Sequence, residues 1–381
     1  AEKRNSALFV QLGSGNINIY VMENSKMVDT YSLKIGGLRI NELFEESLDS
    51  PKDYVQVIRE YLTPFFETLS DAIPEKLSQC IVSGNEIQTI ASMCNATNSL
   101  DFSIMERTAF TKMYKKAKEK GTEAISMEYD IPQEEVEVLL PSLIVLNRLL
   151  KYTVNDSILL SNVLLSDAVM FEMLFPKEAS FVVKAYEEFT LQSATSIAER
   201  FGRDLDHISR VSSVALEIYD KMKKLHGYKL RERTLLQVSA ILQDIGKYVN
   251  VKNHALLSYN TITNLDIVGI NDHERLIIAT VCYYHNGNIP SMDSPIYNQL
   301  SQEDRVMVSK LAAILQISNA INTSHSPKFE QVNVNMKNGK LNIYLTTLKN
   351  INLEKWAFIA KSKLFREVYG LNATIIKRGV L

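Results

Sequence analysis

The sequence predicts a mixed α/β region over residues 1–178, an all-helical region over 179–326 and a small α/β piece over 327–381. Short β-type runs joined by glycine turns fill the first region. From about residue 182 to residue 321, apolar residues recur with a period of about 3.6, which is typical of amphipathic helices. Alternating apolar and polar residues return after that, so the chain is expected to end on a strand-rich segment.

The first region opens with three expected strands, at residues 7–10, 17–21 and 28–33. The turn Gly13-Ser14-Gly15-Asn16 joins the first two, because glycine adopts positive φ at no steric cost. Pro51 begins a helix that extends to about Leu69, since proline is well tolerated in the first helical turn. The remaining expected elements are a strand at 80–83, helices at 85–93, 107–120 and 132–150, and a buried strand at 157–165.

In the second region the expected helices lie at residues 195–201, 207–225, 231–243, 254–262, 272–284 and 301–321. The last region begins with a strand at 332–335. The turn Lys337-Asn338-Gly339-Lys340 then leads into a second strand at 341–345, as in a β-hairpin. A helix at 353–369 and a strand at 373–376 complete the chain.

Composition places the chain among ordinary globular proteins. Apolar residues make up 46% and charged residues 23% of its 381 residues, and the net charge of −2 provides no basic field that would favour nucleic acid. The three cysteines form no CxxC pair, which suits a reducing cytoplasm. No apolar run approaches the roughly 18 residues of a membrane span, and no signal peptide is evident. Because the sequence opens on Ala1 rather than Met and a strand pattern begins by Ala7, we expect a cut at a domain boundary, with processing of a natural terminus as the alternative.

Two glycine turns are candidate anion sites. The strand-turn-strand segment around Gly13-Ser14-Gly15-Asn16 can direct backbone N–H groups at one phosphate, and the strand that ends at Gly84 places a helix N-terminus beside a ligand. An ordinary structural turn is the alternative at each position. Their order, with a three-stranded meander between them, predicts one lobe of an actin-like (ribonuclease H-like) phosphotransferase or phosphatase fold.

A third motif lies in the second region. Residues 241–247 read Ile-Leu-Gln-Asp-Ile-Gly-Lys, which resembles the signature helix of a His-Asp metal phosphohydrolase with Gln243 in place of the histidine. A divalent metal favours a neutral imidazole and a carboxylate at such a pair, and an amide is a much poorer ligand. The alternative is a buried helix in which Asp244 caps a neighbour.

Taken in order, these segments resemble the exopolyphosphatase and guanosine pentaphosphate phosphohydrolase family over essentially the whole chain. The family's second actin-like lobe opens with an Asp-Ile-Gly-Gly-Gly-Ser-Thr-Glu-Leu-type loop, matched here by Gln-Leu-Gly-Ser-Gly-Asn-Ile-Asn-Ile at residues 11–19. Its Leu-Gly-Ala-Val-Arg-Leu segment is matched by residues 35–40, and its Gly-Thr-Ser-Gly-Thr turn by residues 83–86. The first lobe, which supplies the family's catalytic glutamate, has no counterpart in this sequence.

The helical region resembles the family's His-Asp-like domain. The matching segments are His207-Ile-Ser-Arg-Val, His226-Gly, Leu242-Gln-Asp-Ile-Gly, Asn253-His254 with Ser258-Tyr259, Tyr284-His285-Asn-Gly and residues 311–320. The resemblance implies Mg²⁺-dependent cleavage of terminal phosphoanhydride bonds of polyphosphate or guanosine pentaphosphate, with water attacking a phosphoryl group held by loop amides.

Several family positions are substituted. The loop aspartate, which in the family helps to hold Mg²⁺ and the attacking water, is Gln11; the loop hydroxyl is Asn16, and the acidic position after it is Asn18. Glutamine cannot act as a general base and binds hard cations poorly. In the helical domain, Gln243 and Asn319 replace a histidine and an aspartate. These changes predict impaired hydrolysis and argue against a Mg²⁺ cofactor.

The residues expected to bind phosphate are Gly13, Ser14, Gly15, Asn16 and Gly84. Four remnants of the His-Asp-like pattern also persist, namely His207, Asp244, His254 and His285. Two or three scattered ligands rarely hold a metal, so the sequence favours hydrogen-bonded structural residues and no metal site here.

Two basic runs are candidates for contact with polyphosphate, a dense polyanion, and solvated helix faces are the alternative. They comprise Lys112, Lys115, Lys116, Lys118 and Lys120 in one helix, and Lys221, Lys223, Lys224, Lys229, Arg231 and Arg233 around a turn. Three function classes stay open: a phosphoanhydride hydrolase, a non-catalytic sensor of polyphosphate or guanosine polyphosphates, and a scaffold that forms a homodimer through its helical domain. The substitutions favour the second and third classes.

Overall fold

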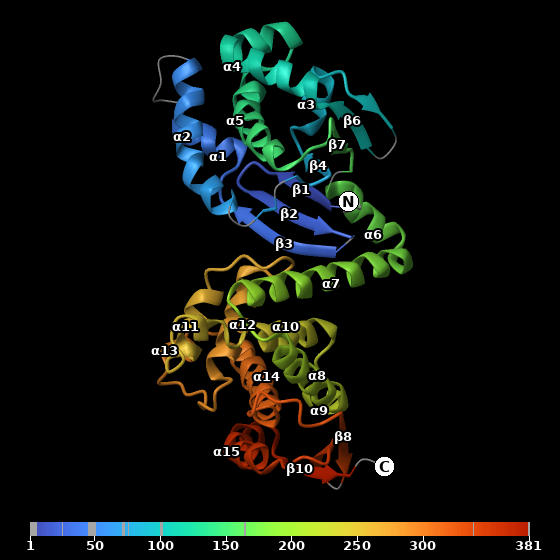
Figure 1. The fold of residues 1–381 in the computed structure, drawn as a ribbon, viewed down its shortest axis with the longest axis vertical. Helices are drawn as coiled ribbons and strands as arrows, with labels where there is room; N and C mark the ends of the chain where they lie inside the picture. The colour runs from blue at the N-terminus through green and yellow to red at the C-terminus, as the bar shows by residue number, and fades with distance from the viewer. Residues whose placement is uncertain are drawn as a thin grey trace. The chain divides into compact units, whose positions relative to one another are not determined.

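The structure is a computed structural model that describes residues 6–24, 26–44, 51–70, 73–74, 76–99, 102–163, 165–337 and 339–379. The chain divides into two compact units, Ala1–Lys184 and Ala185–Leu381, and helix α7 (Pro176–Arg200) contains the division (Figure 1). Each unit has its own hydrophobic core.

A seven-stranded mixed sheet organises the first unit, with the strand order β3-β2-β1-β4-β7-β6-β5. Its strands are β1 (Ser6–Leu12), β2 (Ile17–Glu23), β3 (Lys26–Leu33), β4 (Gln79–Gly84), β5 (Thr97–Asn98), β6 (Phe102–Glu106) and β7 (Ser157–Ser161). The first three strands form an antiparallel meander, whereas β1, β4 and β7 pair in parallel. Alternate residues of β1 and β2 are buried, so Leu8, Val10 and Ile19 enter the core.

Helices pack with this sheet in a single core. They are α1 (Gly37–Phe44), α2 (Pro51–Ser70), α3 (Ile87–Met93), α4 (Arg107–Tyr129) and α5 (Gln133–Leu149) with a 3₁₀ turn (Leu150–Tyr152). Helix α6 (Leu165–Leu174) contributes none of its described side chains to this core. Helix α5 contributes most, because its run of apolar residues is buried on nearly every face.

Most expected elements of this unit are confirmed, with three differences. The strand expected at 157–165 ends at Ser161, and Leu165 begins α6 instead. The helix expected at 107–120 continues to Tyr129 through a kink at Gly121, where φ is +80°. The short strands β5 and β6 and helix α1 were not predicted. Helix α1 begins at Gly37, directly after Gly36, and glycine has low helix propensity, so the local signal for this helix is weak.

The second unit is helical as far as Ile321. Its helices after α7 are α8 (Leu205–Lys221), α9 (Lys223–His226), α10 (Leu230–Leu242), a 3₁₀ turn (Ile245–Tyr248), α11 (His254–Ile262), α12 (Asp272–Tyr284), α13 (Pro295–Asn298) and α14 (Gln302–Ile321). The helices predicted at 254–262 and 272–284 begin and end at the predicted residues. Side chains of Asp204, Asn271 and Ser301 accept hydrogen bonds from the first turns of α8, α12 and α14.

A three-stranded sheet with the order β10-β9-β8 ends the chain, formed by β8 (Gln331–Lys337), β9 (Lys340–Thr346) and, after α15 (Asn352–Tyr369), β10 (Asn372–Arg378). The predicted hairpin is confirmed, since Lys337 pairs with Lys340 in an antiparallel register. Leu341, Ile343 and Phe365 share one core with α14. The boundaries expected at 178 and 326 stay predictions.

The mixed α/β character of the first part and the many helices of the chain are confirmed. Assignment of the first unit to an actin-like lobe remains a proposal. The cysteines Cys80, Cys94 and Cys282 are buried free thiols. Among the described residues, no helix combines the length and the apolarity needed to cross a lipid bilayer.

Candidate functional site

The turn between β1 and β2 is built by close backbone contacts. The N–H of Gly13 donates to the carbonyl of Asn16 at 3.0 Å and closes the turn. Gly36, after β3, lies so near that a Cβ atom there would come within 2.2 Å of the Ser14 carbonyl oxygen and 2.4 Å of the Gly13 carbonyl oxygen. The backbone N–H of Arg39 also donates to the Ser14 carbonyl, at 3.2 Å. The junction between β3 and α1 therefore packs directly on the turn.

The second predicted turn, at Gly84, lies next to the turn between β1 and β2. Strands β1 and β4 pair in parallel with Leu12 opposite Gly84. The φ of Gly84 is +148°, and a Cβ atom there would lie 2.2 Å from the Leu12 carbonyl oxygen. Only glycine fits this contact. The two candidate phosphate turns thus meet at the carboxyl ends of the neighbouring strands β1 and β4.

The positions that carry acidic and hydroxyl groups in the resembling family form a neutral hydrogen-bond network. Asn18 donates to the side-chain oxygen of Gln11 at 3.0 Å, across the paired strands β1 and β2. The side-chain oxygen of Asn18 accepts from the Asn16 amide at 3.1 Å and from the Ser32 hydroxyl at 2.8 Å. These four side chains carry no charge and orient one another.

A buried carboxyl, Glu86, lies two residues beyond Gly84 at the start of α3. Its side chain is buried, and its Oε2 atom has no hydrogen-bond partner in the described part of the chain. Burial raises the pKa of Glu86, although a hydrogen bond from its own backbone N–H acts in the opposite direction. The sequence interpretation counted Glu86 only as part of the turn; an acid directly after a strand-glycine junction was the available signal.

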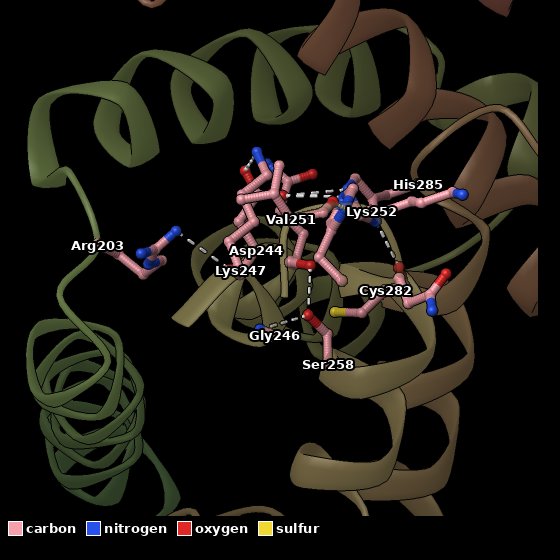
Figure 2. Close-up of polar contacts among 12 residues, drawn as sticks. Arg203, Asp244, Gly246, Lys247, Val251, Lys252, Ser258, Cys282 and His285 are labelled. Carbon is pink, nitrogen blue, oxygen red and sulfur yellow. Dashed lines mark hydrogen bonds and ion pairs between the residues drawn. The ribbon is translucent and has the colours of Figure 1, made fainter. Parts of the chain in front are cut away.

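A second candidate site lies in the helical unit, where Asp244, His254 and His285 converge; Figure 2 shows Asp244 and His285 among their contacts. Asp244 follows α10, His254 opens α11 and His285 ends α12. The Oδ1 atom of Asp244 is 3.3 Å from His285 Nε2 and 3.6 Å from His254 Nε2, and the two nitrogens are 3.3 Å apart. All three residues are buried. The sequence interpretation treated these ligands as scattered, whereas the structure brings them together.

Backbone carbonyls orient both imidazoles of this group. His254 Nδ1 lies 2.7 Å from the Val251 carbonyl, and His285 Nδ1 bonds to the Cys282 carbonyl. A carbonyl only accepts, so Nδ1 carries the hydrogen in each ring and Nε2 presents a lone pair to Asp244. Burial lowers the pKa of His254, and the neighbouring His285 lowers it further, which favours the neutral imidazole.

The two carboxylate oxygens of Asp244 have different surroundings. Its Oδ2 atom accepts a hydrogen bond from Lys247 at 2.7 Å, while Oδ1 faces the two histidines and makes no hydrogen bond within the described residues. Burial opposes ionisation of Asp244, but a hydrogen bond from His285 when its ring is protonated, together with the charge and hydrogen bond of Lys247, outweighs this effect and holds the pKa of that carboxyl well below its usual range. Lys247 was not predicted, although its spacing of three residues from Asp244 was a usable signal.

The fourth remnant, His207, lies near the other carboxylate oxygen, with Nε2 3.9 Å from Asp244 Oδ2. Its Nδ1 atom bonds to the Asn322 amide at 2.8 Å, and its ring stacks on His325 with centroids 3.8 Å apart. Burial, together with the charge of His325, lowers the pKa of His207 to about 4. His325 lies in an irregular segment after α14, where no local pattern marks it.

Asp244, Lys247, His207 and His325 line a cavity of about 150 Å³, together with Gln243. The Gln243 side chain is 1% exposed, and neither its oxygen nor its nitrogen has a hydrogen-bond partner among the residues described. Buried amides are normally hydrogen-bonded, so this one stands out. Hydrogen bonds hold the Gln243 backbone in place. Its carbonyl accepts a hydrogen bond from the Ser258 hydroxyl at 2.8 Å, and the Ser258 hydroxyl oxygen accepts one from the Gly246 N–H at 2.9 Å.

The two basic runs are partly neutralised by ion pairs. Arg231 pairs with Glu274, Arg233 pairs with Asp220, and Lys116 and Lys120 face Glu128. Lys115 and Lys118 instead line an open cavity of about 690 Å³, whose other charged residues are Arg59, Glu60, Glu119 and Arg148. Because acids are mixed with these bases, contact with polyphosphate at either run remains a proposal.

Residues 2–177 match the Ppx/GppA phosphatase family, and residues 191–364 match domain III of the Ppx/GppA phosphatases. The chain belongs to the Ppx/GppA phosphatase family. A guanosine-5'-triphosphate,3'-diphosphate pyrophosphatase from Photobacterium profundum is 20% identical over 322 residues, which cover 81% of this chain and 60% of the relative. The chain thus spans about three fifths of the length of that curated relative.

Two solved structures are similar over part of this Ppx/GppA chain. An exopolyphosphatase from Cytophaga hutchinsonii is 16% identical, with 45% of this chain and 58% of that chain covered and a TM-score of 0.38. A Ppx/GppA family member from Aquifex aeolicus is 17% identical, with 46% and 58% covered and a TM-score of 0.37.

The turn residues do not fit the Mg²⁺ that the family resemblance implies. Proteins hold Mg²⁺ through one or two carboxylates together with substrate phosphates and water. This Ppx/GppA protein offers amides and a hydroxyl from Gln11, Asn16, Asn18 and Ser32 instead, and the Gln11 oxygen already accepts a hydrogen bond from Asn18. The set therefore gives Mg²⁺ no charged ligand.

Proposed function

We propose that this Ppx/GppA family protein binds a phosphate-rich anion, polyphosphate or a guanosine polyphosphate, at the β1–β2 turn and hydrolyses it poorly or not at all. The neutral network of Gln11, Asn16 and Asn18 carries the proposal. Hydrolysis of a phosphoanhydride needs a group that orients and deprotonates water, and a cation that offsets the developing charge. Amide side chains supply neither of these.

Support for binding comes from the geometry of the turn. Within the described residues, the backbone N–H groups of Ser14 and Gly15 have no hydrogen-bond partner, and no atom lies within 4 Å of a Cβ position on Gly15. Consecutive free N–H groups of this kind form an anion-binding concavity. Arg39 adds a positive charge at the same junction, because its backbone is bonded to Ser14 and its guanidinium to the Lys34 carbonyl.

The relatives support the proposed ligand class. The curated relative is named for a guanosine polyphosphate, and the family resemblance implies polyphosphate as well. A scaffold with no ligand at the turn is the competing function. The two differ in one measurable respect, since only the binding protein takes up such an anion.

Calorimetric titration of the full chain with guanosine tetraphosphate and with polyphosphate of defined length separates these alternatives. The informative variants are Gly15→Glu, which puts a negative charge at the open face of the turn, and Gly15→Gln, a neutral control of the same size. We expect the wild type and Gly15→Gln to bind, and Gly15→Glu to bind at least about tenfold more weakly because like charges repel.

Two results would overturn the binding proposal. The absence of binding at millimolar ligand would favour the scaffold, and equal affinities of the two Gly15 variants would place the ligand elsewhere. Phosphate release from the same ligands with Mg²⁺ is expected at the background rate. Robust release by the wild type would contradict the proposed loss of hydrolysis.

A further inference from the structure

We infer that Asp244, His254 and His285 form a binding site for one divalent transition-metal ion of the zinc class. The proposal departs from the expectation of no metal that the sequence favoured. It is independent of the anion site at the turn, since all its ligands belong to the helical unit.

The spacing of the ligand atoms fits such an ion. Bonds of about 2.0–2.2 Å to nitrogen and oxygen in a tetrahedral arrangement place neighbouring ligand atoms about 3.3–3.6 Å apart. The separations here are 3.3 Å from Asp244 Oδ1 to His285 Nε2, 3.3 Å between the two Nε2 atoms and 3.6 Å from Asp244 Oδ1 to His254 Nε2. One ion can therefore contact all three atoms where they already lie.

The hydrogen-bond pattern leaves three acceptors facing one another. The Nδ1 hydrogens of His254 and His285 are committed to the Val251 and Cys282 carbonyls, so both Nε2 atoms present lone pairs. The Oδ1 atom of Asp244 has no donor among the described residues. Buried acceptors in mutual contact repel unless a cation lies between them. A carbonyl on Nδ1 is also the usual way in which a metal-binding histidine is oriented.

The donor types select the class of ion. Two imidazoles and one carboxylate suit zinc and its neighbours, whereas Mg²⁺ and Ca²⁺ favour oxygen ligands. Lys247 binds the other carboxylate oxygen, so the ammonium and the ion use different atoms of Asp244. Three protein ligands leave a fourth position, and the buried, unpartnered amide of Gln243 lies at the residue next to Asp244.

Cobalt titration of the full chain without a histidine tag tests the site, because tetrahedral Co²⁺ gives strong visible absorption. We expect one equivalent to bind and to be displaced by Zn²⁺. His254→Gln and His285→Gln should each weaken binding at least about tenfold. His273→Gln is the matched control, since His273 also contacts a carboxylate, Asp304 at 2.9 Å, but lies outside the group. It should bind Co²⁺ as the wild type does.

The proposal fails if the wild type shows no cobalt absorption, or if the two ligand variants retain it. A measurement on the wild type alone guards against misfolded variants: Zn²⁺ should raise the thermal midpoint and a chelator should reverse the rise, because an ion that binds only the native state stabilises it. A midpoint that does not respond to Zn²⁺ would also contradict the site.

Discussion

Asn18 donates a side-chain amide hydrogen to the side-chain oxygen of Gln11, at 3.0 Å between the paired strands β1 and β2. Both positions carry acids in the family pattern that the sequence resembles. Two neighbouring carboxylates repel unless a cation lies between them, whereas two amides satisfy each other directly. The two substitutions are therefore matched, and together they stabilise the turn without a metal.

An acid restored at position 11 should give the turn a response to Mg²⁺. In Gln11→Asp, Asn18 can still donate to the new carboxylate, which supplies a charged ligand for the cation. We expect Mg²⁺ at tenfold above its dissociation constant to stabilise this variant by about 1.4 kcal/mol in thermal unfolding. The wild type and Gln11→Asn, which has the same length as the aspartate without its charge, should show no change. An equal response of all three proteins would refute this account of the turn.

Gly36→Ala should destabilise the first unit by about 2 kcal/mol or more. Its Cβ would overlap the carbonyl oxygens of Ser14 and Gly13, which cannot retreat without opening the turn. Gly15→Ala is the control, because the described structure leaves that Cβ position free to 4 Å, and its effect should stay within about 0.5 kcal/mol. Urea unfolding measures both values. Similar costs for the two variants would show that the contact between Gly36 and the turn is absent.

Glu86→Gln should stabilise the protein at neutral pH. Burial raises the pKa of Glu86 above the ordinary 4.5, so the native state keeps a proton that the unfolded chain has already released. Unfolding then becomes easier as the pH rises from about 4.5 through the raised native value. The stability of the variant should match that of the wild type at pH 4 and exceed it at pH 8, in denaturant unfolding. Glu42→Gln, at an exposed site, should show no such trend.

Ser258→Ala should lower the free energy of unfolding of the chelator-treated protein by about 1–3 kcal/mol. The Ser258 hydroxyl bridges the Gln243 carbonyl and the Gly246 N–H in a buried site, and alanine loses both hydrogen bonds. Gln243→Met should cost little or should stabilise the metal-free protein, since the buried amide makes no hydrogen bond to the described residues. Chemical denaturation compares the two variants. A loss for Gln243→Met as large as that for Ser258→Ala would mean that the amide has partners in the native state.

Much of the local structure was predictable from the chain alone. Helices α11 and α12 and the hairpin of β8 and β9 follow from residue periodicity and a glycine turn, which act within a few residues. Sequence patterns did not predict elements whose structure depends on contacts between residues far apart in the sequence. Helix α1 begins directly after Gly36, whose packing against Ser14 no nearby residue signals.

The candidate sites depended on long-range packing. Periodicity places Asp244, His254 and His285 at the ends of three helices, but the crossing of those helices determines that their ligand atoms lie 3.3–3.6 Å apart. Likewise, the sequence alone shows that Gln11 and Asn18 stand at positions that are acidic in the family pattern. The hydrogen bonds from Asn18 to Gln11 and from Ser32 to Asn18 form only when β1, β2 and β3 pair in the folded protein. The sequence therefore determines which side chains are present at each site. The distances between them depend on the tertiary structure, because burial of apolar surface positions the helices and strands that carry them.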